Sequence, residues 1–411
     1  MSKVIIIADD LTGANDTAIQ FVKQGLSGLV ILNSGSIRPD LFGNYDVISI
    51  NTNSRILAGD EAYEAVYRTV KQLGTGVFVY KKVDSVLRGN PGEELGAVMD
   101  ALDIPLALAA PSFPANKSLL EKGILNGKTD AVQVFARGTG RKTEGIPLEL
   151  VRKGSGAMAE FINSRNETHK TKVFVADAVT DDDLAIINKA SAMLEPHVLA
   201  GSAGLGNQLA HYPGKAKTAE TKKPASLAPI LIIAGTRMSE TAAQIRTLCN
   251  SIPASLVNFR VSMIAQGQTE KAIDSAFNEV SHNMGQGSKL HIVAVDSMFR
   301  IQDPAGQPNN DIAEGDETSA AICEALGILT DKLMNSFRFP VFLSTGGDTS
   351  MAICRRLGIN AIEPLAEICP GIPLGRIFGG PLDQRHIVTK SGRFGNPASL
   401  VEIVNYLAGG I

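Results

Sequence analysis

Residues 4–25 read VIIIADDLTGANDTAIQFVKQG, and this stretch sets the fold class. Residues 4–8 form an apolar, mostly β-branched run, which is typical of a strand buried on both faces of a sheet. Residues 9–15 have the composition of a loop. From residue 16 to residue 23 apolar side chains return at helical spacing, and Gly25 is a residue that commonly ends a helix. A strand, a loop and a helix in this order indicate an α/β protein.

The same alternation recurs along the rest of the chain. In the first half, further strands are predicted at 28–32, 47–50, 76–80, 105–110 and 172–176, with a helix at 60–73. In the second half, strands are predicted at 230–234, 290–295 and 341–344, helices around 244–249 and at 351–357, and a polar surface loop at 300–318. This pattern predicts an α/β fold of two doubly wound, mainly parallel-sheet domains with a cleft between them.

The boundary between the two domains is predicted at residues 213–229. This segment holds several lysines and prolines and few apolar side chains, so it is interpreted as a linker or hinge. Residues 1–212 are then the N-terminal domain and residues 230–411 the C-terminal domain. A length of 411 residues is consistent with two domains.

The composition of the chain argues against several classes of protein. It has 39 Lys and Arg against 42 Asp and Glu, a net charge of −3, which gives no reason to expect nucleic acid or an anionic membrane as a partner. No apolar stretch reaches the roughly 18 residues that a transmembrane helix needs, and the start of the chain lacks the features of a signal peptide. The 4 cysteines include no CxxC pair, so they predict neither a zinc site nor a disulfide framework. We therefore expect a cytoplasmic protein.

Two acidic residues follow the first predicted strand. Ligands of open parallel sheets bind beyond the carboxyl ends of the strands, so residues at these ends are candidates for a site. Asp9 and Asp10 are adjacent carboxylates that need partners, which could be substrate hydroxyls, a metal ion or cationic side chains. The structural alternative is that Asp10 and Asp16 cap a turn or a helix. Arg55, after the third predicted strand, would reach the same edge of the sheet.

A cluster of polar and charged residues follows the fourth predicted strand, at residues 81–90, KKVDSVLRGN. An Arg such as Arg88 can bind a carboxylate through two hydrogen bonds, and a Lys such as Lys82 adds a compact positive charge. Asp84 and Ser85 could hydrogen-bond hydroxyl groups. This combination suits a small hydroxy acid as ligand, and the alternative interpretation is an exposed charged turn.

Glycine-containing loops in the second half suggest a nucleotide site. Residues 344–350, STGGDTS, follow a predicted strand and lead into a helix, so Gly346 and Gly347 would let backbone N–H groups approach a phosphate at the helix N-terminus. Two further segments, GTRMS at 235–239 and KSGRFGN at 390–396, could gather around the same nucleotide.

Two other glycine-containing segments have the wrong spacing for known nucleotide motifs. Residues 123–129, GILNGKT, have three residues where a Walker A loop needs four, and the glycines of 138–145 do not match the dinucleotide fingerprint. The sequence therefore supports neither a P-loop nucleotidase nor a standard NAD-dependent sugar-acid dehydrogenase.

Three blocks carry a resemblance to the four-carbon acid sugar kinase family. These blocks are ADDLTGANDT at 8–17, KVDSVLRGN at 82–90 and TGGDT at 345–349. Supporting blocks are PSFPAN at 111–116, GSAGL at 201–205 and KSGRFG at 390–395. The blocks occur in order along nearly the whole chain, and the first two are long and distinctive.

The resemblance implies an N-terminal domain that binds a sugar acid and a C-terminal domain that binds ATP, with Mg²⁺ expected as well. The reaction would phosphorylate the 4-hydroxyl of a four-carbon sugar acid such as threonate or erythronate. The residues implied in sugar-acid binding are Asp9, Arg55, Lys82, Val83, Asp84 and Ser85, to which the charge pattern adds Asp10 and Arg88. Among the acids, Asp84 and Asp9 rank first as catalytic residues that contact the acceptor. The residues implied in ATP binding are Ser239, Gly346, Gly347, Asp348, Thr349 and Gly392, and metal ligands are not assigned.

The chain departs from the family pattern at three places. Val86 stands where the family usually has Thr, Asn-Lys-Ser at 116–118 stands where Asn-Gly-Arg is common, and GTRMS replaces a Gly-Ser-x-Ser nucleotide loop. Whether Thr236 or Ser239 meets the phosphates therefore stays open.

The departures favour a subgroup that acts on D-threonate, with L-threonate and D-erythronate as alternatives. A non-catalytic sensor that binds a sugar acid is the alternative of a different class. A homo-oligomer is left open.

Overall fold

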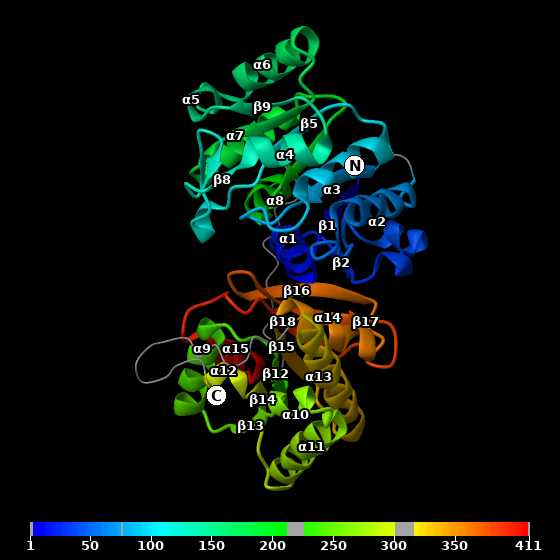
Figure 1. The fold of residues 1–411 in the computed structure, drawn as a ribbon, viewed down its shortest axis with the longest axis vertical. Helices are drawn as coiled ribbons and strands as arrows, with labels where there is room; N and C mark the ends of the chain where they lie inside the picture. Colours follow the sequence, from blue (N-terminus) through cyan, green and yellow to red (C-terminus); the bar gives the residue numbers. More distant parts are fainter. Residues whose placement is uncertain (1–2, 75–76, 212–225, 301–315, 410–411) are drawn as a thin grey trace. The chain divides into compact units, whose positions relative to one another are not determined.

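The computed structural model describes residues 3–74, 77–211, 226–300 and 316–409 (Figure 1). The chain forms two compact units, Met1–Ala219 and Glu220–Ile411. Most of the predicted linker at 213–229 and of the predicted loop at 300–318 lies outside the described residues. The predicted linker boundaries and the predicted cleft therefore stay predictions, and each unit is described by itself.

The N-terminal unit is built on a parallel sheet. Its strands, in spatial order, are β2 (Gly28–Ile31), β3 (Val47–Asn51), β1 (Lys3–Ala8), β4 (Val77–Lys82), β11 (Val198–Gly201), β5 (Ala107–Ala110), β10 (Val173–Ala176) and β9 (Thr143–Ile146). Ala8 is the register partner of both Asn51 and Lys82, so β1, β3 and β4 end at the same level. The residues that follow these three strands therefore share one edge of the sheet.

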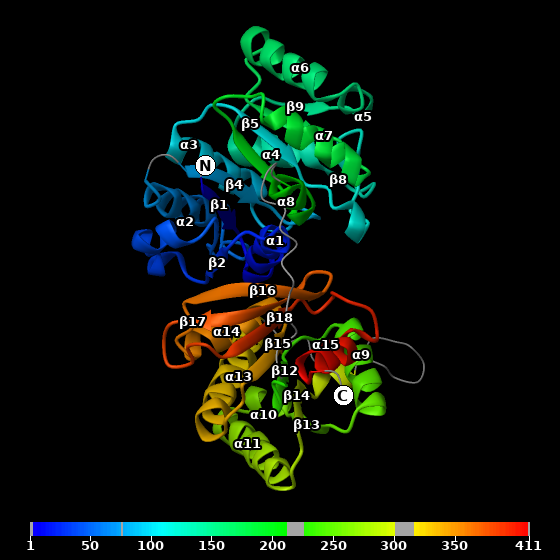
Figure 2. The same ribbon diagram turned by 180° about the vertical axis from the view of Figure 1, so that it is seen from behind.

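Helices form two rows in this unit, as a doubly wound sheet requires. One row is α2 (Gly59–Lys71), α3 (Pro91–Leu102) and α4 (Ala131–Thr139), seen from the front in Figure 1. The other row is α1 (Leu11–Lys23), α8 (Ala203–Ala210), α7 (Asp181–Ser191) and α6 (Ser155–Thr168), with α5 (Leu148–Val151) beside it, seen from behind in Figure 2. The smaller elements are η1 (Ser34–Ser36), η2 (Pro39–Asn44), η3 (Pro114–Asn116) and a small antiparallel sheet of β6 (Leu120–Glu121), β7 (Ile124–Leu125) and β8 (Thr129–Asp130). Apolar side chains of strands and helices, Ile6, Phe21 and Phe174 among them, are fully buried together in the core.

The C-terminal unit has a sheet that is parallel along most of its width. Its strands, in spatial order, are β13 (Ser255–Phe259), β14 (Leu290–Val295), β12 (Ile230–Ala234), β15 (Val341–Thr345), β18 (His386–Lys390), β17 (Ile372–Phe378) and β16 (Ala361–Cys369). The pairings from β13 to β18 are parallel, and β18–β17 and β17–β16 are antiparallel. Ala234, Thr345 and Lys390 are in register at the ends of three neighbouring strands.

Helices again form two groups. One contains α10 (Val261–Ala265), α11 (Thr269–Gly285), α13 (Asp316–Ser336) and α14 (Gly347–Arg356), and the other contains α9 (Ser239–Ser251), α12 (Ser297–Arg300) and α15 (Ser399–Leu407) (Figure 1). The prediction of α/β units with mainly parallel sheets is confirmed.

Two helix starts differ from the prediction. Residues 9–15 are not a loop, because α1 already begins at Leu11, where Asp10 caps it by accepting a 2.7 Å hydrogen bond from the N–H of Gly13. Similarly, α14 begins at Gly347 rather than at residue 351. The first turn of α14 reads GDTS and that of α1 reads LTGA, and neither shows the apolar periodicity that the prediction relied on.

Several strands escaped prediction. The antiparallel pair β16–β17 contains Glu363, Pro364 and Glu367, and the pairing shifts register between Pro364 and Ala366. Charged residues and a proline obscure the strand pattern there. β11, a short apolar run, and β18, in which only two of five residues are apolar, also had no prediction.

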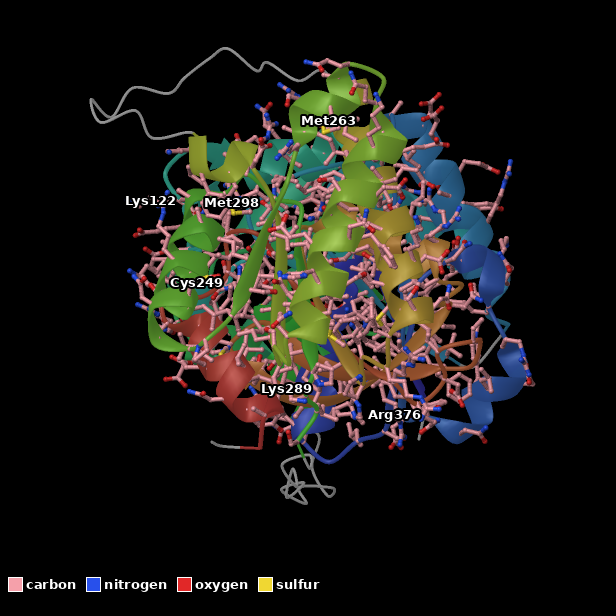
Figure 3. All side chains as sticks on the ribbon, turned by 90° about the horizontal axis from the view of Figure 1, so that it is seen from below. Lys122, Cys249, Met263, Lys289, Met298 and Arg376 are labelled. Carbon is pink, nitrogen blue, oxygen red and sulfur yellow. The ribbon has the colours of Figure 1, made fainter. Side chains whose placement is uncertain are left out.

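The cysteines and the helix lengths bear on the predictions made from composition. All four cysteines are free thiols, and Cys249 lies on α9, as Figure 3 shows. Within the described ranges, no helix is long and apolar enough to cross a membrane.

Candidate active site

The ends of β1, β3 and β4 bring most of the predicted sugar-acid residues together. Asp9 and Asp10 follow β1, Arg55 lies four residues beyond the end of β3, and Lys82 is the last residue of β4. Asp84 comes two residues later in the turn that leads to α3. The sequence-based expectation that these side chains share one edge therefore agrees with the coordinates.

Arg55 is the centre of this group. Its Nε and Nη2 donate to the two carboxylate oxygens of Asp9 at 2.6 and 3.0 Å, and its Nη1 donates to Oδ2 of Asp10 at 2.5 Å. Its Nη2 also lies 3.6 Å from Oδ2 of Asp84. The two adjacent carboxylates thus find a cationic partner, which was one of the three partners considered from the sequence. Asp10 also takes the helix-capping role that was the structural alternative.

The two adjacent aspartates differ electrostatically. Burial alone would raise the pKa of Asp9, but the charges of Arg55 and the two lysines at the end of β4 outweigh it and hold this pKa below its ordinary value. Burial and the neighbouring charge of Asp9 raise the pKa of Asp10. Ionising both of two carboxylates this close costs free energy because the like charges repel each other. The charge of Arg55 favours ionisation of Asp9.

Asp84 organises the turn after β4. Its carboxylate accepts hydrogen bonds from the N–H of Val86 at 3.0 Å and from Nη2 of Arg88 at 2.6 Å. Burial opposes ionisation of Asp84, but the hydrogen bonds and charge of Arg88, together with Arg55, bring its pKa well below the ordinary value. The side chain of Arg88 is 56% exposed, so this pair opens to solvent on one side.

Two of the residues predicted to bind the sugar acid have carbonyl oxygens that already accept a hydrogen bond from a neighbouring side chain. Val83 is buried in the core, its N–H donates to the carbonyl oxygen of Gly201, and its own carbonyl accepts from Lys82. Val83 therefore cannot present its side chain to a ligand at this edge. Ser85 is half-buried, and its carbonyl oxygen accepts a hydrogen bond from the hydroxyl of Ser118.

Lys82 differs from Arg55 in how its charge is used. Its Nζ donates to the carbonyl oxygen of Val83 at 2.8 Å and lies close to the first turn of α1, since a Cβ added at Gly13 would be 3.0 Å from it. In the part of the chain that the structure describes, Lys82 forms no ion pair, whereas Arg55 faces three carboxylates. Lys82 is therefore the cation at this edge that remains available for a ligand carboxylate.

A buried polar layer beneath the edge was not assigned from the sequence. Lys81 is fully buried on β4 and forms a 2.8 Å ion pair with Glu94 of α3. Glu94 also accepts a 2.6 Å hydrogen bond from Ser54, whose hydroxyl meets that of Thr52 at 2.7 Å. The signal for this layer in the sequence was the pair of consecutive lysines at residues 81 and 82. Because successive side chains of a strand point to opposite faces, the two lysines had to lie on different faces of the sheet.

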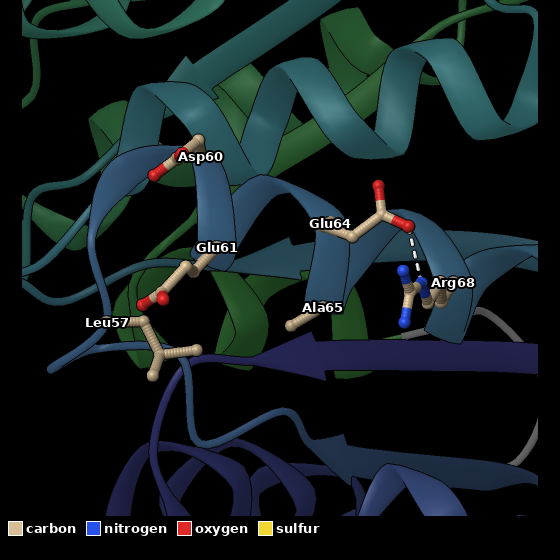
Figure 4. Close-up of a pocket in the computed structure, with 6 residues that line it drawn as sticks. All are labelled: Leu57, Asp60, Glu61, Glu64, Ala65 and Arg68. Atoms are coloured by element: carbon tan, nitrogen blue, oxygen red, sulfur yellow. Dashed lines mark hydrogen bonds and ion pairs between the residues drawn. The ribbon is translucent and has the colours of Figure 1, made fainter.

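A cavity of about 520 Å³ lies along α2 (Figure 4). Its lining residues are Leu57, Asp60, Glu61, Glu64, Ala65 and Arg68, and Arg68 forms an ion pair with Glu64. The other acidic side chains make this cavity unsuitable for an anionic ligand, so we do not assign the sugar acid to it.

In the C-terminal unit, the loops after β12, β15 and β18 meet at the sheet edge. Gly346 donates its N–H to the carbonyl oxygen of Lys390 at 2.9 Å, and Thr241 of α9 donates to the carbonyl oxygen of Gly392 at 2.7 Å. A Cβ added at Gly392 would lie 2.4 Å from Oγ1 of Thr236, so the loops after β12 and β18 touch there. This is the convergence of glycine-containing loops that the sequence suggested.

The predicted nucleotide residues occupy different depths at this edge. Thr349 is buried in the first turn of α14, and Gly346 and Gly347 are half-buried. Asp348 is exposed in the same turn. Ser239 is exposed and donates to the carboxylate of Glu240 at 3.2 Å. Thr236, rather than Ser239, therefore has its hydroxyl inside the region where the loops meet.

Comparison with known proteins agrees with both halves of this picture. The chain matches the model of a sugar-binding N-terminal domain at residues 4–132 and 125–209, and that of a nucleotide-binding C-terminal domain at residues 231–400. It is 29% identical to a D-threonate kinase of Salmonella typhimurium, with 98% of each chain covered. It is 28% identical to a D-erythronate kinase of Heliobacterium modesticaldum, with 99% of this chain and 97% of that one covered.

This chain belongs to the four-carbon acid sugar kinase family. As a member of that family it is an ATP-dependent sugar-acid kinase, which confirms the prediction of a kinase and disfavours a non-catalytic sensor. The family also includes a 3-oxo-tetronate kinase of Cupriavidus necator, 27% identical over 98% of this chain and 96% of that one.

Solved structures support the fold of this family member. A Haemophilus influenzae protein superposes with a TM-score of 0.73 at 22% identity, covering 98% of this chain and 99% of that one. A Salmonella typhimurium protein gives a TM-score of 0.77 at 22% identity with the same coverage.

Proposed function

We propose that this kinase transfers the γ-phosphoryl group of ATP to the 4-hydroxyl of D-threonate. The observation that carries the proposal is the combination of Lys82, a cation without an ion pair among the described residues, with the carboxylates of Asp9, Asp10 and Asp84. A ligand with one carboxylate and several hydroxyls matches this combination, because carboxylates accept from hydroxyls and an ammonium attracts a carboxylate. The similarity to D-threonate kinases along the whole chain supports the choice of acid.

In this proposal the aspartates position the 4-hydroxyl of the sugar acid and do not remove its proton before phosphoryl transfer. The pKa values of Asp9 and Asp84 lie below the ordinary range, which makes both groups weak bases but good hydrogen-bond acceptors. Phosphoryl transfer passes through a loose transition state in which placement and charge stabilisation matter most. Asp9 uses one hydrogen bond on each oxygen toward Arg55 and keeps acceptor capacity for a substrate hydroxyl.

On the nucleotide side, we propose that Gly346, Gly347, Thr349 and Gly392 border the phosphates, with Thr236 as the hydroxyl of the β12 loop. Among the described residues, no group of three acidic, His or Cys side chains could hold a metal ion on its own. This fits Mg²⁺, which is commonly held by nucleotide phosphates and one or two carboxylates. Exposed Asp348 would supply such a carboxylate, and Mg²⁺ would neutralise phosphate charge.

The test is an ADP-release assay over D-threonate, L-threonate, D-erythronate, L-erythronate and the 3-oxo-tetronates, with the phosphorylated carbon located by NMR. The proposal predicts the highest kcat/KM for D-threonate and phosphate on carbon 4. A kcat/KM for another tetronate at least tenfold higher than that for D-threonate would identify that acid as the substrate instead. Phosphate on any carbon other than carbon 4 would overturn the proposed geometry. Asp84→Asn serves as the matched low-activity control.

D-Erythronate is the second candidate. The observation that favours it is the 28% identity to a D-erythronate kinase over 99% of this chain, which is as strong as the similarity to the D-threonate kinases. The two acids differ only in configuration at carbon 2, so the same charges would bind both. The assay above separates them directly.

A further inference from the structure

Lys390 is a buried, positively charged residue at the edge of the C-terminal sheet where the loops after β12, β15 and β18 meet. The nucleotide site proposed above gives it no role. Lys390 is the last residue of β18 and is 1% exposed. Its Nζ donates to the carbonyl oxygen of Ser391 at 2.9 Å and to Oγ1 of Thr241 at 3.3 Å. An ammonium has three donors, so these two bonds leave one more. Across the ranges that the structure describes, Lys390 takes part in no ion pair.

The location of Lys390 links it to the predicted ATP residues. Its carbonyl oxygen accepts from the N–H of Gly346, and its ammonium shares the Thr241 hydroxyl with the carbonyl of Gly392. It is also the register partner of Thr345, the residue before the glycine pair. The ammonium thus lies where the three loops meet, next to the groups proposed to border the phosphates.

A buried ammonium without a counter-charge is costly, because burial removes hydration that nothing replaces. Burial lowers the pKa of Lys390 to about 8, and the carboxylate of Glu240 only partly opposes this. A methionine of similar length would fill the same space without that cost. The side chain therefore lowers the stability of the unliganded protein, which makes a purely structural role a poor explanation.

The other groups around Lys390 do not neutralise it. The charged side chains at the ends of the elements that meet here are Glu240 in the first turn of α9, Asp348 in the first turn of α14, Arg237 in the β12 loop and Arg393 in the β18 loop. Glu240 is the one whose field raises the pKa of Lys390, and all four side chains are exposed. Arg246 of α9 and Arg355 and Arg356 of α14 lie further along their helices. The thiol of Cys323, 3.6 Å from Oγ1 of Thr349, has a pKa that burial raises, which favours its neutral form.

We propose that Lys390 binds the phosphate chain of ATP and that nucleotide binding draws a proton from solution onto this side chain when the medium is alkaline. The inference rests on the proposed placement of ATP at the three loops. Phosphate charge next to the ammonium favours its protonated form. Below about pH 7 Lys390 is already protonated, so binding takes up no proton there. Above about pH 8 the free protein has lost the proton and regains it from the buffer when ATP binds.

Calorimetry of ATP binding tests this on the whole 411-residue chain. Binding is measured at pH 7.0, 8.0 and 9.0 in two buffers of different ionisation enthalpy, which yields the number of protons taken up. The phosphate of the nucleotide titrates near roughly pH 6 and so does not contribute in this window. For the wild type we expect uptake near zero at pH 7.0 that approaches one proton at pH 9.0, and an affinity that falls about fivefold to tenfold between pH 8.0 and 9.0.

Three variants give the control comparisons. Lys390→Arg keeps its charge at every pH tested and should lose both the proton uptake and the pH dependence. Lys390→Met should bind ATP about tenfold to a hundredfold more weakly at pH 7.0, with a melting temperature of the free protein equal to or above the wild type. Lys332→Met removes an exposed lysine that pairs with Asp274 in the same unit, and it should behave as the wild type.

Each outcome decides between the possibilities. Wild-type binding without proton uptake at pH 9.0 overturns the inference, as does normal ATP affinity in Lys390→Met. A lowered melting temperature in Lys390→Met with an unchanged proton uptake in Lys390→Arg would assign Lys390 a structural role instead. Absence of ATP binding by the wild type at every pH would overturn the proposed nucleotide site itself, which is a different result from loss of the lysine effect alone.

Discussion

Removal of Arg55 should destabilise the N-terminal unit more than its partial exposure suggests. The guanidinium is 19% exposed and makes three charge-assisted hydrogen bonds of 3.0 Å or less to Asp9 and Asp10. In Arg55→Met, Asp9 would keep a buried charge with no bonded cation. Breaking a buried ion pair costs about 3–5 kcal/mol, and the partial exposure places this case near the lower end, at about 3 kcal/mol.

The pH dependence of this loss has a definite sign. In the wild type the pKa values of Asp9 and Asp84 are lowered, so their contribution to stability is present above about pH 4 and is lost as the pH falls. In Arg55→Met the pKa of Asp9 rises through burial, so the folded protein binds a proton more readily than the unfolded chain. The stability deficit of the variant should therefore shrink as the pH is lowered from 7 to 5.

Scanning calorimetry at pH 7.0 and pH 5.0 measures both effects. A loss of about 3 kcal/mol corresponds to a fall of roughly 6–12 °C in the melting temperature of a unit of this size. Arg88→Met is the matched control, because its guanidinium is 56% exposed and pairs with one carboxylate, so its removal should cost at most about 1 kcal/mol. Equal losses in the two variants, or a deficit for Arg55→Met that grows at pH 5.0, would refute this account of the site.

Three further changes separate the two ligand sites. Lys82→Met should weaken tetronate binding about tenfold or more in calorimetry while the melting temperature stays within a few degrees, because this ammonium has no ion pair to lose among the described residues; unchanged binding would remove Lys82 from the site. Asp84→Asn should lower kcat about 10²-fold or more because the acceptor hydroxyl loses its positioning group, and it should also lower the melting temperature because the carboxylate holds the turn through Arg88; a kcat within threefold of wild type would contradict both the positioning and the structural role. Gly392→Ala should reduce ATP affinity at least tenfold but leave tetronate affinity intact, because the new Cβ would lie 2.4 Å from Thr236, and equal loss of both ligands would contradict separate sites.

Local patterns predicted the parts of the fold that depend on short stretches of sequence. The apolar run at 4–8 and the one at 230–234 became central strands because such runs are buried on both faces of a parallel sheet. The rule that ligands gather beyond strand ends then placed Asp9, Arg55 and Lys82 at one edge, which the register of β1, β3 and β4 explains.

The failures have two causes. The start of α1 depends on a local capping bond, which the N–H of Gly13 donates to Asp10 and which an apolar pattern does not reveal. The burial of Lys81 depends on its ion pair with Glu94 of another element. The sequence could not show that Lys81 is paired while Lys82 is not. It also gave no reason to separate Lys390 from its neighbours, because its burial arises only when three loops meet.

The two sites use charge in different ways. In the N-terminal unit, Asp9, Asp10 and Asp84 face Arg55 and Arg88, so the protein supplies counter-charges to its own carboxylates. Lys82, which has no ion pair among the described residues, is the cation that we propose for the substrate carboxylate. A singly charged acid needs one such partner, while its hydroxyls need acceptors, and paired carboxylates remain acceptors. In the C-terminal unit, we propose that backbone N–H groups and the buried ammonium of Lys390, which donates to the carbonyl oxygen of Ser391, face the several negative charges of ATP. An acceptor site whose charges are already paired recognises the positions of the substrate hydroxyls. A nucleotide site with an unpaired positive charge gains most of its binding free energy from the phosphates. Raising the salt concentration should therefore weaken ATP binding more than sugar-acid binding, because screening acts on the ligand with more charge.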